Sequence, residues 1–338
     1  MDDRTIVFDW LSISGHFSSY EDMFSLLGLS NSDLVNLFRK SNGRNFFSDG
    51  LTFTYNGKQI MSFYLGQTLD NDLGMIDLSG QGLRFFESYS QITIPDLLDI
   101  CNQSDDLNVT RIDIAYDIKS EEYPIDKFVK YYESGDYVSR AHFTSIIKSN
   151  DNGVQGTSIY FGKQSSDCRI NIYDKRSERG LSREDLPSGW IRIETRLRHK
   201  TANSFVAEFC SGVPISELYK GVLTDKLRFV IHSKDSNKRR VRVAPWWQKL
   251  IGDCDRITLS QPGTTYEYGR WEEHLFKQCG SRIKTYLKLH TPEELIRELK
   301  VRNISITATQ EFIVDNYITG VEFYELGGND DIEENRGD

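Results

Sequence analysis

Apolar and polar residues alternate over many short stretches of the chain, a pattern typical of β-strands that bury one face. The first such stretch covers residues 5–14, and residues 21–40 follow with apolar positions at helical spacing. Three more strand-like runs lie at 51–55, 59–65 and 74–78, with the strong hairpin signal Asn56-Gly57 between the first two. The pattern predicts a strand, a helix and then three strands.

The same order of elements returns in the next part of the chain. Residues 110–117 have the pattern of a strand and residues 125–132 that of a helix, and strand-like runs follow at 142–147, 157–161, 169–173 and 190–196. We therefore predict an α+β fold: a mostly antiparallel sheet built from a duplicated β-α-β-β-β unit, with helices on one face. The repeat is one of pattern and not of residue identity.

Beyond about residue 205 the pattern becomes helical, in segments 202–210, 215–223, 268–289, 292–299 and 308–316. We expect one domain over residues 1–205 and a mainly helical C-terminal region over residues 206–326. Residues 327–338 are almost all Gly, Asn, Asp, Glu and Arg, too polar to offset the entropy of ordering, so we expect a disordered acidic tail.

The net charge of −9 and the pI of 5.3 argue against nucleic acid as a partner, because Lys and Arg supply the affinity for phosphates. Basic residues nevertheless concentrate in 163–200 and 234–242, so one face of an acidic molecule can be positive. The acidic N-terminus lacks the features of a signal peptide, and no stretch reaches the roughly 18 apolar residues of a membrane span. We expect a cytoplasmic protein without a membrane partner.

Three of the predicted strands each carry charged residues on one face. Alternation along these strands places together Arg111, Asp113 and Asp117; Arg169, Asn171, Tyr173 and Lys175; and Arg192, Glu194 and Arg196. A sheet face that is merely solvated is the ordinary alternative, but such faces tend to carry Thr, Ser, Lys and Gln. Acids, arginines and a tyrosine together are what phosphate chemistry needs.

The residue types suggest separate roles. Carboxylates can hold Mg²⁺ or Mn²⁺, arginines bind phosphate oxygens, and Tyr173 supplies a nucleophile whose phenolate would need nearby cations such as Lys175, Arg169 and Arg192. We prefer Asp113 and Glu194 as metal ligands. Asp117 is a lesser candidate, because four residues of unbroken strand put it about 13 Å from Asp113. A tyrosine taken alone, one of 17, is more often a packing residue.

The motifs that carry these residues match a known family in their order. They are residues 7–11, 78–84, 111–117, 157–162, 169–175, 190–196 and 270–271, the last followed by a helix to about residue 289. With them the chain resembles the rolling-circle replication initiators, which include transfer-type plasmid initiators, filamentous-phage initiators and related relaxases of integrative conjugative elements. The resemblance covers residues 5 to about 290.

The resemblance implies an origin-specific enzyme that nicks one DNA strand through a 5′-phosphotyrosine intermediate with a divalent metal. The family's nucleophile falls on Tyr173, and its acidic residues fall on Asp113 or Asp117 and on Glu194. Homodimerisation is also implied, and the helicase would come from the host because no Gly-x-x-x-x-Gly-Lys loop is present. For contacts with origin DNA we consider the basic residues Lys163, Arg196, Lys238, Arg239, Arg240 and Arg242, with duplex recognition in the C-terminal region.

Two other functions fit the same residues. A tyrosine recombinase would form a 3′-phosphotyrosine without a metal, and a non-catalytic DNA-binding regulator would keep the fold but cleave nothing. Tyr160 is the main competitor of Tyr173 as nucleophile. Tyr116 is a weaker one, because strand alternation turns it to the apolar side with Ile112 and Ile114.

Overall fold

The structure, a computed structural model, describes residues 3–29, 36–44, 47–67, 73–151, 154–181, 186, 189–233, 235, 237, 240–252, 259, 280 and 283–302. The chain forms two compact units, Met1–Gln261 and Pro262–Asp338. In the second unit, helix α11 (Pro292–Val301) confirms the helix predicted at 292–299. The predicted helix at 308–316 and the tail at 327–338 lie outside the described residues.

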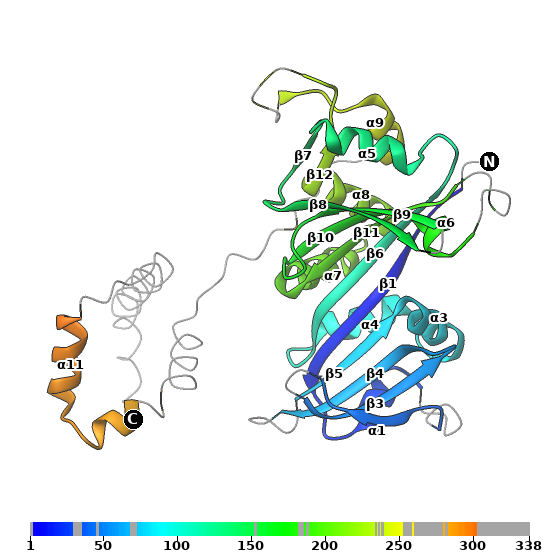
Figure 1. Ribbon diagram of the computed structural model, residues 1–338. Coiled ribbons are helices and arrows are strands. Elements are labelled where there is room, and N and C mark those ends of the chain that lie inside the picture. The colour runs from blue at the N-terminus through cyan, green and yellow to red at the C-terminus, as the bar shows by residue number, and fades with distance from the viewer. Residues whose placement is uncertain are drawn as a thin grey trace, which may run out of the picture. The chain divides into compact units, whose positions relative to one another are not determined.

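One antiparallel sheet of ten strands, in the order β2-β3-β4-β5-β1-β6-β11-β10-β9-β8, dominates the first unit (Figure 1). Its strands are β1 (Asp3–His16), β2 (Arg39–Asn42), β3 (Phe47–Tyr55), β4 (Lys58–Gln67), β5 (Leu73–Ser79), β6 (Asn108–Lys119), β8 (Thr144–Asp151), β9 (Val154–Phe161), β10 (Cys168–Asp174) and β11 (Ile191–Arg198). A separate two-stranded sheet pairs β7 (Tyr137–Ser139) with β12 (Leu227–Phe229).

The sheet consists of two halves with the same internal order. β1 and β6 pair at the centre; β5, β4, β3 and β2 follow outward from β1, and β11, β10, β9 and β8 follow outward from β6. Helix α1 (Tyr20–Leu26) comes after the first central strand and helix α5 (Ile125–Glu133) after the second. This arrangement confirms the predicted α+β fold with a duplicated unit. Within it β11, the last of these strands in the sequence, lies between β6 and β10.

The structure differs from the predicted pattern in the first half. Of the helix predicted over 21–40, the described residues contain α1: it ends at Leu26, shortly before Gly28 takes the left-handed conformation with φ +60°, and β2 begins at Arg39. Two further helices, α3 (Gly80–Tyr89) and α4 (Ile94–Gln103), had no counterpart in the prediction. Ser79 and Thr93 cap their first turns, and two glycines near the start of α3 weaken its sequence signal.

Helices α7 (His199–Cys210), α8 (Ile215–Lys226) and α9 (Pro245–Ile251) belong to the same unit as the sheet. The Tyr219 hydroxyl of α8 donates to the Ile193 carbonyl oxygen of β11 at 2.9 Å, and Tyr116 of β6 donates to the Leu250 carbonyl oxygen of α9 at 3.1 Å. The expected domain boundary near residue 205 falls inside α7, which packs on β6, so the backbone has no break there.

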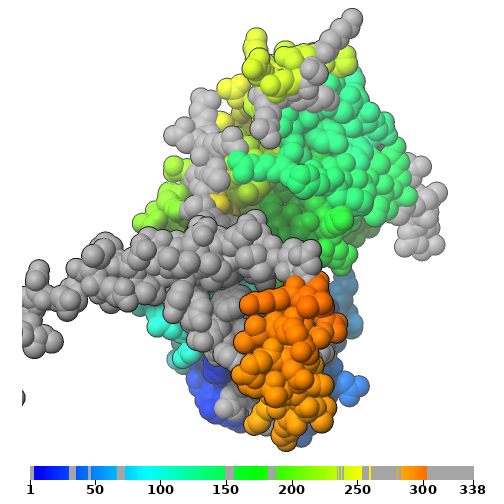
Figure 2. All heavy atoms as spheres, turned by 90° about the vertical axis from the view of Figure 1, so that its left-hand side faces the viewer, coloured from blue at the N-terminus to red at the C-terminus, as the bar shows by residue number. Residues whose placement is uncertain are grey.

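Aromatic side chains pack helix α5 of the second sheet half against helix α9. Phe128 of α5 contacts Trp246 and Trp247 of α9 with ring centroids 5.2 Å and 6.5 Å apart. In the turned view of Figure 2, the green segment that includes α5 lies next to the yellow segment that includes α9. None of the helices in the described part of the chain is long and apolar enough to cross a membrane.

Candidate functional site

A cavity of about 600 Å³ opens on the polar face of the sheet, at the central strands β1, β6, β11 and β10. Helix α3 and the short helix α6 (Lys175–Glu178) also contribute to its wall. The sequence-predicted residues on its lining are Asp113, Asp117, Tyr173, Lys175, Arg192, Glu194 and Arg196. Strand alternation therefore predicted correctly that six of these side chains share one face of the sheet. Lys175 was expected on the same strand as Tyr173; it begins α6 instead and still lines the cavity.

The strand register places the charged side chains and Tyr173 in rows across the sheet. Arg192 of β11 pairs with Asp117 of β6 on one side and with Tyr173 of β10 on the other. Glu194 occupies the next row on the same face, between Ala115 and Asn171. Because side chains alternate along each strand, Tyr173, Arg192 and Glu194 project into the same cavity while the intervening isoleucines enter the core.

Asp9 also lines the cavity, and the sequence did not identify it. The pairing of β1 with β6 shifts between Phe8 and Trp10, so Asp9 lies in a β-bulge that directs its carboxylate to the site. Gly80 leaves room for this carboxylate, since a Cβ atom there would be 2.6 Å from Asp9 Oδ1. The sequence signal is the three-residue step between the buried Phe8 and Leu11, where an unbroken strand would step by two.

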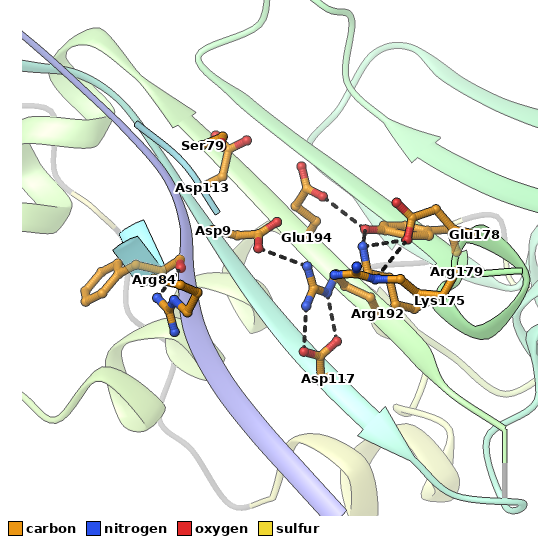
Figure 3. Close-up of polar contacts among 12 residues, drawn as sticks. Asp9, Ser79, Arg84, Asp113, Asp117, Lys175, Glu178, Arg179, Arg192 and Glu194 are labelled. Carbon is orange, nitrogen blue, oxygen red and sulfur yellow. Dashed lines mark hydrogen bonds and ion pairs between the residues drawn. The ribbon is translucent and has the colours of Figure 1, made fainter. Parts of the chain in front are cut away.

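Arg192 is held between two carboxylates (Figure 3). Its Nε and Nη2 atoms donate to Asp117 Oδ1 and Oδ2, both at 2.7 Å, and its Nη1 atom donates to Asp9 Oδ1 at 3.0 Å. Trp190 Nε1 adds a third bond to Asp117, at 2.7 Å to Oδ1. Burial opposes the charge on Arg192, but the bond with Asp117 and the nearby Asp9 outweigh it and raise its pKa. Asp117 thus has both oxygens engaged.

Asp113 is likewise engaged by arginines. It is 1% exposed, receives Arg111 Nε on Oδ1 at 2.8 Å, and receives Arg196 Nε on Oδ2 at 3.2 Å. Arg111 Nη2 bonds to Asp113 Oδ2 as well, and the Arg111 guanidinium lies 4.0 Å from the centroid of the Trp10 ring. A buried carboxylate that partners two guanidinium groups fixes their positions.

Glu194 and Asp9, unlike Asp113 and Asp117, do not have both carboxylate oxygens bonded to arginine or tryptophan nitrogens. Burial, together with the neighbouring Asp113 and Asp9, raises the pKa of Glu194 to about 7 against the opposing effect of Arg196 and Arg192. Burial also raises the pKa of Asp9, against the opposing effect of Arg192. Glu194 has an arginine only at a distance, with Arg196 Nη2 3.8 Å from its Oε1. Two desolvated carboxylates that repel each other are stabilised by a shared cation.

The donor set fits a magnesium or manganese ion better than a softer metal. Mg²⁺ prefers oxygen ligands, and it is usually held by one or two carboxylates together with water and substrate phosphate. Asp9 and Glu194 offer such oxygens beside the cavity. Among the described residues, no three His, Cys, Asp or Glu side chains form a cluster suited to a metal ion by themselves. A site here would therefore need the substrate to complete it.

Tyr173 lies between an acid and a base. Its hydroxyl donates to Glu194 Oε2 at 3.4 Å and accepts from Lys175 Nζ at 3.4 Å. Lys175 is buried and forms a 2.7 Å ion pair with Glu178. Burial, with Glu194 second, raises the pKa of Tyr173 above its ordinary value. The phenol is therefore protonated at rest, and its activation requires added positive charge or a proton acceptor.

The remaining candidate residues lie elsewhere. Arg169 is not on the cavity lining; its guanidinium covers the ring of Tyr160 at 4.2 Å. Tyr116 is buried on the apolar face, as expected. Lys163 borders a different cavity of about 400 Å³ at the turn between β9 and β10. Arg240 and Arg242 are described, with Arg242 in a bridge segment beside Ile231, whereas Lys238 and Arg239 lie outside the described residues.

Comparisons with known proteins relate the chain to replication initiators. The family model for replication initiation factors matches residues 107–299. A protein of Bacillus subtilis (strain 168) named as a DNA relaxase, NicK, is 26% identical over 249 residues, which is 71% of this chain and 70% of that protein. A solved structure of the rolling circle replication initiator protein from Geobacillus stearothermophilus has a TM-score of 0.65 and 25% identity, and covers 77% of this chain and 99% of its own. The family match includes β6, β10 and β11, the strands that hold Asp113, Tyr173 and Glu194.

Proposed function

The chain belongs to the family of replication initiation factors, and from that membership we propose that it nicks one strand of its own replication origin with Tyr173. One observation carries the assignment: the Tyr173 hydroxyl lies 3.4 Å from both Glu194 Oε2 and Lys175 Nζ, in a cavity whose wall holds further carboxylates and arginines. A phenol between a proton acceptor and a cation is the arrangement that a tyrosine nucleophile requires.

In this mechanism the Tyr173 oxygen attacks the phosphorus of a phosphodiester. The bond from phosphorus to the 3′ oxygen breaks, the 5′-phosphate becomes linked to Tyr173, and the released 3′-hydroxyl takes up a proton. The phenol proton passes first toward Glu194 Oε2, the atom that accepts its hydrogen bond. Lys175 Nζ stabilises negative charge on the phenol oxygen. Religation is the reverse reaction, with the 3′-hydroxyl attacking the phosphotyrosine.

Glu194 and Asp9 would hold Mg²⁺ or Mn²⁺, with Asp113 behind them. Such a metal polarises a phosphate oxygen and neutralises the charge that develops on it. We assign Asp117 the task of holding Arg192, because the guanidinium and Trp190 use both of its oxygens. Arg192 in turn positions Asp9 and places positive charge near Tyr173.

The substrate we propose is origin DNA, a single-stranded or cruciform nick site with flanking duplex. Within residues 206–326, Lys238, Arg239, Arg240 and Arg242 supply positive charge for duplex recognition. For strand separation we propose a host helicase as the partner. Inverted repeats at an origin would suit a homodimer acting in the cytoplasm.

The test is formation of a covalent adduct. The protein is incubated with a single-stranded oligonucleotide of its origin in Mn²⁺ or in EDTA, and the products are separated on a denaturing gel. We expect an adduct with wild-type protein and with Tyr160→Phe in Mn²⁺, and none with Tyr173→Phe, which keeps the ring but lacks the attacking oxygen. Removal of the metal by EDTA should also abolish the adduct.

Other outcomes separate the competing functions. Adduct formation by Tyr173→Phe, or a peptide map that finds the phosphate on Tyr160, contradicts the assignment of the nucleophile. A 3′-linked adduct formed in EDTA identifies a tyrosine recombinase. Tight binding of the origin without any cleavage identifies a non-catalytic regulator.

A further inference from the structure

Four arginines gather on the polar face of the sheet, next to the catalytic cavity. They are Arg111 of β6, Arg196 and Arg198 of β11, and Arg169 of β10, and we call them the arginine patch. Arg198 pairs with Arg111 across two strands, and Arg196 pairs with Arg169 across the next two. Since cross-strand pairs share a face, the four side chains form two adjacent rows. Figure 1 shows the strands involved, β6, β11 and β10, side by side.

The patch has more positive charge than its surroundings neutralise. Asp113 is the buried acid within it, and it partners Arg111 and Arg196. Arg169 and Arg198 have no ion pair with any of the residues that the structure describes. Arg169 Nε is also buried without a hydrogen-bond partner. Burial, together with the neighbouring arginines, lowers the pKa of both Arg169 and Arg198. Like charges held this close favour an anionic ligand.

Aromatic rings hold two of these arginines in place. The Arg169 guanidinium lies 4.2 Å from the centroid of the Tyr160 ring, and Arg111 has the corresponding position over Trp10, at 4.0 Å. A guanidinium that rests on an aromatic face keeps its donors available to a ligand while its conformational freedom is restricted. The patch is therefore organised before any ligand arrives.

The patch continues from the catalytic cavity in one direction along the strands. Arg111 and Arg196 belong to both, because they line the cavity and pair with Arg198 and Arg169. Arg169 is four residues from Tyr173 on β10, and Arg198 is four residues from Glu194 on β11, which is about 13 Å along each strand. Both arginines lie toward the turn between β9 and β10, since Arg169 follows that turn directly and the Arg198 backbone N–H donates to the Asp167 carbonyl oxygen within it. A chain of phosphates that enters the cavity can follow this line.

We propose that the arginine patch binds the phosphate backbone of the single DNA strand that flanks the scissile phosphate, and that the strand leaves Tyr173 toward the turn between β9 and β10. This assignment rests on the proposed function and names two residues, Arg111 and Arg198, for contact with the substrate strand. Arginine forks bind phosphate oxygens in pairs, so the strand would be held in one position relative to the nucleophile. The patch would act on any sequence, because phosphate contacts position the strand and do not read its bases.

The experiment measures binding without cleavage. The full chain with Tyr173→Phe is titrated into fluorescein-labelled oligothymidylates of increasing length, without divalent metal, over a series of salt concentrations. Into this background we place Arg169→Gln, Arg198→Gln or both, with Arg39→Gln on the edge strand β2 as the matched control. For single strands the logarithm of the affinity changes with the logarithm of salt by about 0.7 per phosphate contact.

We expect each patch variant to lower affinity and to reduce the salt slope by about 0.7, the double variant to reduce it by about twice as much, and Arg39→Gln to change neither. The affinity of the parent should rise with oligonucleotide length until the patch is filled, and the variants should stop gaining affinity at a shorter length. Unchanged slopes in both single variants, or an equal loss with Arg39→Gln, would overturn the proposal. A wild-type protein that forms no adduct with its origin would instead overturn the proposed function.

Discussion

The two halves of the sheet share their strand order but treat their acidic residues differently. In the first half, Asp77 of β5 is held by neutral donors: Ser12 Oγ at 2.5 Å and Trp10 Nε1 at 2.6 Å, both reaching Oδ1. In the second half, Asp113 and Asp117 accept hydrogen bonds from arginines, and the nearest arginine nitrogen to Glu194 is Arg196 Nη2, 3.8 Å from its Oε1. The same architecture thus carries a hydrogen-bonded acid with neutral partners in one half and charged groups suited to catalysis in the other.

This difference shows that the sheet supplies positions and the side chains decide the chemistry. The first half still contributes to the site, but by geometry: the bulge in β1 presents Asp9, and Arg84 of α3 donates to the Phe8 carbonyl oxygen beside it at 3.1 Å. The aromatic cluster under that half, with Phe24 and Phe38 each about 5 Å from Phe63, stabilises the scaffold. Acids in the two halves should therefore respond very differently to the same substitution.

The largest difference in nicking rate is expected when single carboxylates inside and outside the cavity are replaced by amides. Asp9→Asn and Glu194→Gln should each slow nicking by at least about a hundredfold, because each removes a carboxylate from the catalytic cavity. Asp77→Asn should nick at the wild-type rate, because its side-chain oxygen can still accept from Ser12 and Trp10. Single-turnover cleavage of a labelled origin oligonucleotide in Mn²⁺ measures all three. A comparable loss in Asp77→Asn would contradict the proposed difference between Asp77 and the carboxylates of the catalytic cavity.

A smaller effect should link the first half to the site through Gly80. Gly80→Ala places a Cβ atom where Asp9 Oδ1 lies 2.6 Å away, so the carboxylate must move and its bond to Arg192 must change. We expect nicking to slow by a factor on the order of ten to a hundred with little change in thermal stability. Ser88→Ala, on the exposed side of the same helix, is the control and should be neutral. Normal activity in Gly80→Ala would remove Asp9 from the mechanism.

The smallest expected effect is on the pH dependence of stability. Burial raises the pKa of Glu194 from 4.5 to about 7, so the metal-free folded state prefers the protonated acid. The stability due to this preference is complete below pH 4.5 and is lost as the pH rises toward 7. Wild-type protein in EDTA should therefore lose thermal stability over that interval more steeply than Glu194→Gln. Parallel melting curves for the two proteins across pH 4.5–7 would show that Glu194 ionises normally.

Much of the fold could be predicted because its central strands alternate strictly. Residues 110–117 and 190–196 have one apolar and one charged face, and they are the cores of β6 and β11. Helix α3 gave a weaker signal, because Gly80 and Gly82 interrupt it. Helix α4 has apolar residues at helical spacing and a capped first turn, and the prediction overlooked this pattern. Helix α1 was predicted too long because apolar spacing alone does not show where Gly28 turns the chain.

Only those residues of the candidate site that lie on regularly alternating strands could be predicted from the sequence. That rule placed Tyr173, Arg192 and Glu194 on one face, and the register then brought them together. Asp9 was missed because a bulge breaks the period of two. The clamp of Asp117, Arg192 and Asp9 could not be foreseen, since no pattern within one strand reveals which distant strand lies beside it.

The position of β11 has a consequence for synthesis of the protein on the ribosome. This strand is the last of the ten to be made, yet it lies between β6 and β10 in the sheet. Strands β8, β9 and β10 therefore cannot join the hydrogen-bonded sheet of the central strands until β11 has been made. Such late, long-range pairing is slow to form. A nascent or prematurely terminated chain that ends before Ile191 contains Tyr173 but neither Arg192 nor Glu194. On the proposed assignment, a product that ends before Ile191 cannot cut DNA.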